Sequence, residues 1–81
     1  MQIILKKQPQ KYLDSVDVNT RSKLYKAIDK LSRLEGDIKP LKGLSNSYRY
    51  KIAHYRILFT VDRKNLIITV LEINTRTNIK Y

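Results

Sequence analysis

Two adjacent runs of alternating residues in the middle of the chain constrain its fold more than any other feature. Residues 47–59 read Ser-Tyr-Arg-Tyr-Lys-Ile-Ala-His-Tyr-Arg-Ile-Leu-Phe. β-Branched and aromatic residues at a spacing of two favour strands, so we predict two strands that reverse direction near Ala53 and His54. Because successive side chains leave a strand on opposite faces, this hairpin would have one apolar face and one cationic face.

The cationic face would carry Arg49 and Lys51 from the first strand and Arg56 from the second. Like charges on neighbouring strands repel, by a few tenths of a kcal/mol to about 1 kcal/mol for each directly opposed pair. A bound polyanion would remove this repulsion, so the pattern indicates a binding face. The apolar face would carry the alternate residues Tyr48, Tyr50, Ile52, Tyr55, Ile57, Phe59 and Val61.

The overall charge of the chain supports the same interpretation. Its 81 residues include 17 Lys and Arg against 7 Asp and Glu, which gives a formal net charge of +10. Beyond residue 40 the only acidic residues are Asp62 and Glu72. So basic a domain is expected to bind a nucleic acid, an acidic protein, or both. A merely solvated basic surface is the weaker alternative, because a surface of mixed sign would keep the protein equally soluble.

The sequence lacks the residues needed for disulfides, metal sites and membrane spans. There is no cysteine, which excludes a disulfide framework and thiolate chemistry. One histidine and no cluster of metal-ligating residues predict neither a metal site nor a cofactor. The apolar run at residues 3–5 is too short for a signal peptide or a membrane span. We therefore expect a cytoplasmic protein without a membrane partner.

The first 36 residues predict a strand followed by a helical hairpin. Residues 1–5 form a short apolar run typical of a strand. Pro9 suits the first turn of a helix, where its missing N–H costs nothing, and residues 11–16 favour a short helix. Asn19 or Thr20 is expected to cap a longer helix, and Gly36 to end it. The apolar positions of that helix recur at spacings of three and four, at Leu24, Ala27, Ile28, Leu31 and Leu34.

The rest of the chain predicts a connector and a meander. Residues 37–46 contain Pro40 and Gly43, which interrupt regular structure, and are expected to be a connector. After the hairpin, residues 62–65 predict a turn, and the nearly continuous apolarity of residues 66–73 predicts a central strand covered on both faces for much of its length. The whole chain, residues 1–81, is then one α+β domain: an N-terminal strand, a helical hairpin on one face, and a three-stranded antiparallel meander that the first strand joins.

In this order and spacing the motifs resemble the RelE/ParE toxins, the toxic halves of bacterial and archaeal type II toxin–antitoxin pairs. The resemblance covers essentially the whole chain. It rests on Pro-Leu-Lys-Gly-Leu at residues 40–44, Tyr-Arg-Tyr-Lys-Ile at residues 48–52, Tyr-Arg-Ile-Leu-Phe at residues 55–59, and a late Arg76 before Tyr81. It implies the RelE-like microbial RNase fold.

The resemblance also implies an activity. RelE-like members cut mRNA in the ribosomal A site, whereas ParE-like members share the fold, lack the nuclease residues and poison DNA gyrase. Carried over by position, the RelE-like catalytic residues fall on Arg49, Lys51, Arg56, Arg76 and Tyr81. All five are of a suitable type, which favours the endoribonuclease branch.

RNA cleavage without a metal requires the 2′-OH to attack the adjacent phosphate, with a base, an acid and cations in place. Lys51 is the expected base, and Arg49 and Arg56 the expected stabilisers of the phosphate charge. Arg76 would serve the leaving group or a phosphate. His54 is a secondary candidate for the base.

Two further features complete the implied RNA-binding site. Tyr81, or alternatively Tyr50, would stack on a base of the RNA. Lys80 would join the cations that bind the phosphates, so that the expected RNA-binding set is Arg49, Lys51, Arg56, Arg76 and Lys80.

Each assignment has a structural alternative. Arg49 and Lys51 could be solvated cations on an exposed face, and Arg56 could pair with Glu72 on the neighbouring strand. The alternation of Tyr48, Tyr50 and Tyr55 is more typical of core residues than of stacking platforms.

Three functions remain open at this point. The first is a ribosome-dependent mRNA endonuclease, whose partners are the ribosome and the mRNA in its A site. The second is a DNA gyrase poison, and the third is a non-catalytic binding or repressor subunit. An acidic antitoxin is implied as a partner, with a segment that covers the basic surface and an apolar groove between the helices and the sheet edge.

Overall fold

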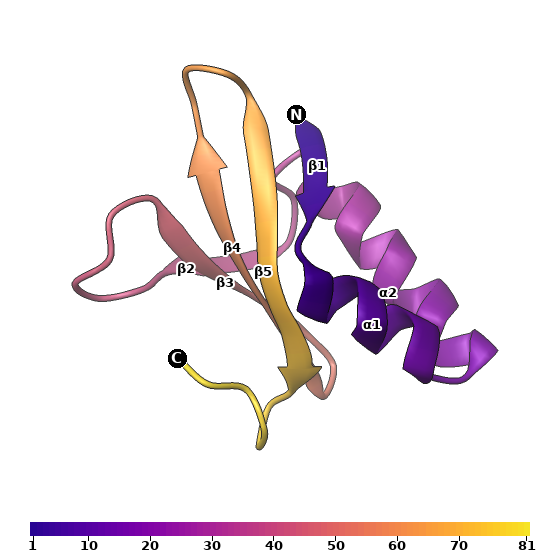
Figure 1. Ribbon diagram of the computed structural model, residues 1–81. Helices are drawn as coiled ribbons and strands as arrows, with labels where there is room; N and C mark the ends of the chain where they lie inside the picture. The colour runs from indigo at the N-terminus through magenta and orange to yellow at the C-terminus, as the bar shows by residue number, and fades with distance from the viewer.

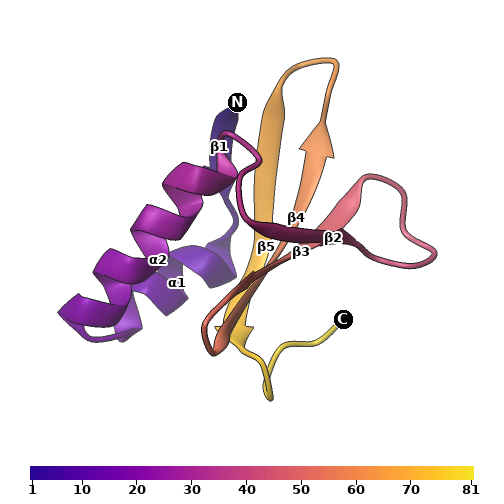
Figure 2. The ribbon, with the colours of Figure 1, turned by 180° about the vertical axis from the view of Figure 1, so that it is seen from behind.

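Two helices lie against one face of a five-stranded sheet in the computed structural model, which describes residues 1–81 (Figure 1). The view from behind shows the helices on one side of the sheet and the C-terminal segment on the other (Figure 2). The elements follow the chain as β1 (Gln2–Leu5), α1 (Lys7–Ser15), α2 (Val18–Leu31), β2 (Asp37–Pro40), β3 (Ser47–Ile52), β4 (Tyr55–Asp62) and β5 (Ile67–Thr75).

The strands are ordered β1-β5-β4-β3-β2 across the sheet. The predicted antiparallel meander is present as β3, β4 and β5, and the first strand joins it by pairing parallel to β5. In the β3–β4 register Tyr50 lies opposite Ile57, and Lys51 lies opposite Arg56. The α+β architecture is as the sequence predicts, and the element order differs from the prediction by one additional strand, β2.

The connector prediction for residues 37–46 was wrong over its first four residues. Asp37–Pro40 forms β2, which pairs antiparallel with the outer side of β3. Pro40 is compatible with this position because an edge strand has one side that needs no backbone donor. Alternation around Ile38, with a polar residue on either side, was the signal for this strand.

The prediction for the last strand needs two corrections. Leu66 is an exposed turn residue with φ of +57°, and β5 begins at Ile67. β5 does lie inside the sheet, but the helices cover only one of its faces. A shift in register opposite Leu58 and Phe59 leaves Leu71 40% exposed, so the strand is not covered on both faces.

The helix ends differ from prediction at three points. Lys7 begins α1 four residues before the predicted Lys11, while Pro9 lies in the first turn as predicted. Asp17, and not Asn19 or Thr20, caps α2: its carboxylate accepts the backbone N–H groups of both residues, at 3.1 and 3.2 Å. Hydrogen bonds from the side chain and backbone of Thr20 lower the pKa of Asp17.

At its other end α2 stops at Leu31, short of the predicted Gly36, because a turn with Leu34 at φ of +54° intervenes. Neither helix has the length and apolarity needed to cross a membrane.

The core lies between the helices and the sheet. It takes in the predicted helical stripe from Leu24 to Leu31 and the inward residues of the meander. Tyr48 and Tyr55 pack at its edge, as the core interpretation of the tyrosines predicts. The buried cluster consists of Leu13, Leu24, Ala27, Ile28, Leu31, Tyr50, Ile57, Phe59, Val61, Ile68, Val70 and Ile73.

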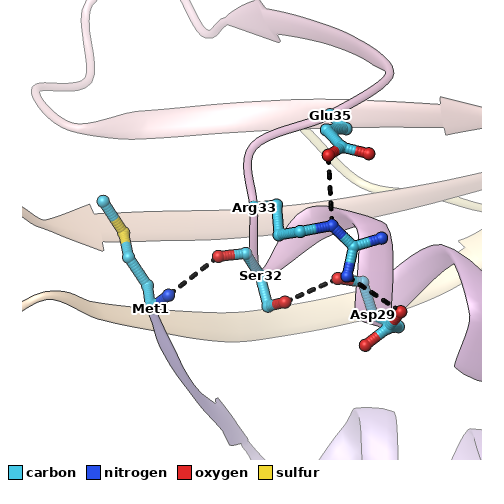
Figure 3. A network of polar contacts seen from close by, with 5 residues as sticks. All are labelled: Met1, Asp29, Ser32, Arg33 and Glu35. Atoms are coloured by element: carbon cyan, nitrogen blue, oxygen red, sulfur yellow. Dashed lines mark hydrogen bonds and ion pairs between the residues drawn. The ribbon is translucent and has the colours of Figure 1, made fainter.

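Polar contacts attach the helices to the strands. The side-chain amide of Gln8 on α1 donates to the Ile73 carbonyl at 2.8 Å and accepts the Ile73 N–H at 2.9 Å. These bonds give the backbone of Ile73 hydrogen-bond partners at a point of β5 that lies beyond the end of β1. At the other end of the helical layer, the amino group of Met1 donates to the Ser32 carbonyl at 2.8 Å, and Arg33 pairs with two carboxylates (Figure 3).

The segment between α2 and β2 passes close to the core at Gly36. Its φ is +120°, and a Cβ added there would lie 2.6 Å from the Tyr50 hydroxyl oxygen. Gly36→Ala is expected to lower the free energy of unfolding by about 2–3 kcal/mol, because the backbone is strained and Tyr50 must move. Gly43 is the matched control, since its φ is +76° but nothing lies within 4 Å of an added Cβ. Gly43→Ala should cost about 1 kcal/mol in denaturant unfolding. Equal losses in the two variants would contradict the Tyr50 contact.

Candidate functional site

The face of the sheet turned away from the helices, called here the open face, carries three of the predicted site residues. Arg49 and Lys51 reach it from β3, and Arg56 reaches it from β4. Lys51 and Arg56 are direct cross-strand partners, whose Cβ atoms are therefore about 4.5–5.5 Å apart. The three cations thus share one face as predicted, and the register sets Lys51 opposite Arg56.

Lys39 extends this row of cations and was missed by the sequence analysis. It lies on β2 directly opposite Arg49, with its side chain on the same face. It was missed because residues 37–46 were interpreted as a connector. The open face therefore holds cations from three neighbouring strands.

None of these cations forms an ion pair within 4.0 Å, although Asp37 on β2 is the direct cross-strand partner of Lys51. The two ion pairs of the protein join Arg33 to Asp29 and to Glu35, each at 3.1 Å, away from the open face. Glu72 does lie on β5, but it faces Leu58, while Arg56 faces Asn74. The alternative in which Arg56 pairs with Glu72 is therefore wrong, because the register offsets the two residues.

Arg56 is the one buried charged side chain, at 9% exposed. Its Nη1 donates to the carbonyl oxygens of Ala53, at 3.1 Å, and Tyr55, at 2.8 Å, across the β3–β4 turn. Its Nε and Nη2 have no protein partner. Since no fully buried polar side-chain atom in the protein lacks a partner, neither nitrogen is completely shielded from solvent. One end of the guanidinium is fixed, and its other edge presents two donors, which suits a phosphate or carboxylate.

The C-terminal segment, residues 76–81, lies on the side of the sheet opposite the helices (Figures 1 and 2). The Arg76 N–H donates to the His54 carbonyl at 2.8 Å, which brings Arg76 to the β3–β4 turn that Arg56 stabilises. The side chains of Arg76 and Lys80 are exposed and take part in no ion pair. Tyr81 is 67% exposed.

The secondary candidates are placed differently. His54 is exposed at the tip of the β3–β4 turn, beside Arg76, and its side chain makes no hydrogen bond. Tyr50 points into the core and is 3% exposed, so its alternative role as a stacking platform is wrong. Burial, with a smaller effect of Glu35, raises the pKa of Tyr50.

The site is a surface and not a cleft. None of the four hollows in the protein is lined by Arg49, Lys51 or Arg56. No group of three or more His, Cys, Asp and Glu side chains is placed to hold a metal ion. What the open face offers chemically is a primary amine among guanidinium groups, an arrangement that stabilises negative charge on a bound phosphate.

A family model described as the ParE toxin of the type II toxin–antitoxin system parDE matches residues 3–79. No curated protein matches the sequence.

Solved structures share the fold. A chain of the archaeal RelE–RelB complex from Pyrococcus horikoshii is 24% identical, with a TM-score of 0.77 over 96% of this chain and 97% of that one. A chain of the toxin–antitoxin complex RelBE2 from Mycobacterium tuberculosis is 20% identical, with a TM-score of 0.79 over 95% and 92%. The YoeB/ParE toxin from Agrobacterium tumefaciens is 16% identical, with a TM-score of 0.75 over 94% and 99%. At these identities the likeness establishes the fold alone, and the predicted RelE-like fold is confirmed.

The hydrogen bonds of Arg56 predict that it contributes to stability as well as to charge. Arg56→Ala should lower the free energy of unfolding by about 1.5–3 kcal/mol, because both bonds to the turn are lost from a charged donor. Lys51→Ala removes a solvated cation and should change it by less than about 0.5 kcal/mol. Urea unfolding of the two variants measures the difference. Arg56→Ala with native stability would show that the turn does not depend on this guanidinium.

Proposed function

The chain belongs to the ParE toxin family of type II toxin–antitoxin systems, within the RelE/ParE superfamily, and we propose that it is a ribosome-dependent endonuclease of mRNA. One observation carries the proposal. The two-donor edge of Arg56 lies beside Lys51 on an open face where no carboxylate forms an ion pair with either residue, although Asp37 lies opposite Lys51 on β2. Like charges on neighbouring strands repel and lower the stability of the fold, and solubility alone does not require them to be placed together.

The proposed reaction is transfer of the phosphate to the neighbouring 2′ oxygen. The Lys51 amine, in its neutral form, takes the proton of the 2′-OH as the new O2′–P bond forms. Arg56 and Arg49 stabilise the charge on the phosphorus oxygens. The P–O5′ bond then breaks, and O5′ receives a proton from an acid. The products are a 2′,3′-cyclic phosphate and a free 5′-OH, and a DNA strand is spared because it lacks the attacking hydroxyl.

The C-terminal segment would complete the site. Arg76, held near the turn by its backbone bond to His54, is the proposed partner of the leaving group or of the phosphate. Tyr81 is the remaining exposed tyrosine of the predicted stacking pair and would stack on a base, which is worth about 1–3 kcal/mol in single-strand binders. Lys80 would contact a neighbouring phosphate. His54 is the second candidate for the base.

The shallowness of the open face supports a role for the ribosome. A flat array of cations can neutralise a phosphate, but it cannot align the 2′-OH with the P–O5′ bond, and that alignment supplies much of the rate enhancement. We propose that the ribosome holds the message in its A site in the required geometry. This would also protect free RNA in the cytoplasm from cleavage.

An acidic antitoxin is the second proposed partner. Complexes with RelB antitoxins are among the structures that share the fold. An apolar groove of about 250 Å³ lies beyond the end of α2, with Tyr48 and Phe59 stacked at 5.5 Å between ring centres in its wall. We propose that an apolar stretch of the antitoxin fills this groove and that its acidic residues cover the cations. The groove is lined by Leu34, Gly36, Ile38, Tyr48, Phe59, Val61 and Arg63.

A DNA gyrase poison is the alternative, and the matched family description, which names ParE, favours it. The same cations would then bind an acidic protein surface, and no single lysine would be indispensable, because rim charges of an interface contribute little each. The two functions therefore differ in how strongly they depend on Lys51.

Induced expression in a bacterium, followed by primer extension on an abundant message, tests the proposal. Native protein should produce in-frame cuts that require translation, and Lys51→Ala should reduce cleavage by about 10²–10⁴-fold, the usual contribution of a general base. Lys51→Ala is a cleaner probe than any change at Arg56, which also holds the turn. Lys23→Ala is the matched control, because it removes the same charge from an exposed position on α2 and should leave cleavage unchanged.

The other outcomes contradict the endonuclease. Growth arrest with intact message and a DNA-damage response would identify the gyrase poison. Harmless expression of the native chain would identify a binding or repressor subunit.

A further inference from the structure

Leu58 and Ile79 are buried apolar residues outside the core. They are 6% and 8% exposed, yet neither belongs to the buried cluster beneath the helices. Leu58 lies on β4 between Arg49 on β3 and Glu72 on β5, and therefore points to the open face. Because the helices are on the other side of the sheet, Leu58 is shielded from water by its neighbours on the open face together with another segment of the chain, or by one of these alone.

The C-terminal segment is in the right place to do so. After β5 ends at Thr75, the Ile79 N–H donates back to the Thr75 carbonyl at 2.9 Å, and the Arg76 N–H donates to His54 at 2.8 Å. These bonds turn residues 76–81 back toward the β3–β4 hairpin, on the side of the sheet opposite the helices (Figure 1). Ile79 is the one buried residue of this segment.

We infer that Ile79 is a positioning residue, which packs over Leu58 and thereby holds Arg76, Lys80 and Tyr81 beside the Lys51–Arg56 pair. The docking of the segment follows from burial and hydrogen bonding alone. Its consequence for cleavage rests on the proposed function.

Electrostatics explains why an apolar contact is needed here. The segment brings Arg76 and Lys80 toward a face on which cations outnumber the two carboxylates, Asp37 and Glu72, so the net charge opposes docking. Ordering six residues also costs conformational entropy. Only a few solvent-exposed backbone hydrogen bonds and the burial of Ile79 offset the charge repulsion and the loss of entropy. Burial of an apolar side chain is insensitive to charge, so it can hold cations together where ion pairs cannot.

The first test measures docking without reference to catalysis. Amide hydrogen exchange of Arg76 and Ile79 is followed by NMR in the native chain, Ile79→Ala, Ile79→Val and Val18→Ala. Val18 is 71% exposed on α2 and serves as the control for loss of an apolar side chain. Exchange at both amides should be at least about tenfold faster in Ile79→Ala and near native in the other two, with an unchanged thermal midpoint, because release of the segment is a local opening. Native exchange in Ile79→Ala overturns the inference.

The second test measures positioning. Single-turnover cleavage by saturating toxin on programmed ribosomes should fall about 10–100-fold in Ile79→Ala, as expected for a small displacement of active groups, and recover in Ile79→Val. In a background that already carries Arg76→Ala, Lys80→Ala and Tyr81→Ala, Ile79→Ala should cause no further loss, because the groups it positions are gone. A further loss in that background, or native cleavage despite faster exchange, overturns the positioning role.

The two tests separate this inference from the proposed function. If the native chain cleaves no message, the proposed function fails. The exchange measurement then still supports or overturns the docking of the segment by Ile79.

Discussion

The pairing of β3 with β4 determines the core and the candidate site together. In this register Tyr50 and Ile57 meet on the helix side of the sheet, and the next pair, Lys51 and Arg56, meets on the open face. A slip of one residue would exchange the two sets and bury the cations, at a cost that no small domain could sustain. The burial of the apolar residues therefore maintains the concentration of positive charge, although the charges repel one another.

Arg56 shows how such a site can be rigid without a cleft around it. One nitrogen of its guanidinium is bound to the hairpin turn, and the others have no protein partner and are not fully buried. A ligand that binds this edge does not have to immobilise a long side chain, which lowers the entropic cost of binding. The same arrangement makes Arg56 a structural residue, so that mutational loss of activity at this position has two causes. Lys51 has no such second role.

The features that could be predicted from the sequence are those that the spacing of nearby apolar residues specifies. Period two in residues 47–59 indicated the hairpin and the facing cations, and the spacing of Leu24, Ala27, Ile28 and Leu31 indicated the buried face of α2. β2 was missed because four residues with a terminal proline carry little strand signal. The cap at Asp17 was missed because Asn19 and Thr20 are also favoured cap residues, and the residue that caps a helix depends on where the helix begins.

Other features depend on contacts between distant parts of the chain, which a single sequence does not show. The hydrogen bonds of Arg56 require the backbone of the turn, where Ala53 has φ of +51°. A single apolar residue in a polar segment gives no periodic signal, so the sequence does not indicate that Ile79 is buried. The activity is a different matter, because the RelE and ParE branches share one fold, and a fold alone does not distinguish them.

The central claim is that the open face binds phosphate through the free edge of Arg56, and NMR titration with RNA tests it most directly. The arginine Nε–H signals would be followed at low salt during addition of a short single-stranded RNA with 2′-O-methyl riboses, which cannot be cleaved. The account predicts that Arg56, Arg49 and Arg76 shift in a saturable way, while Arg33, already paired with Asp29 and Glu35, does not. Shifts that are spread evenly over all arginines, Arg33 included, or that are absent from Arg56, would contradict it.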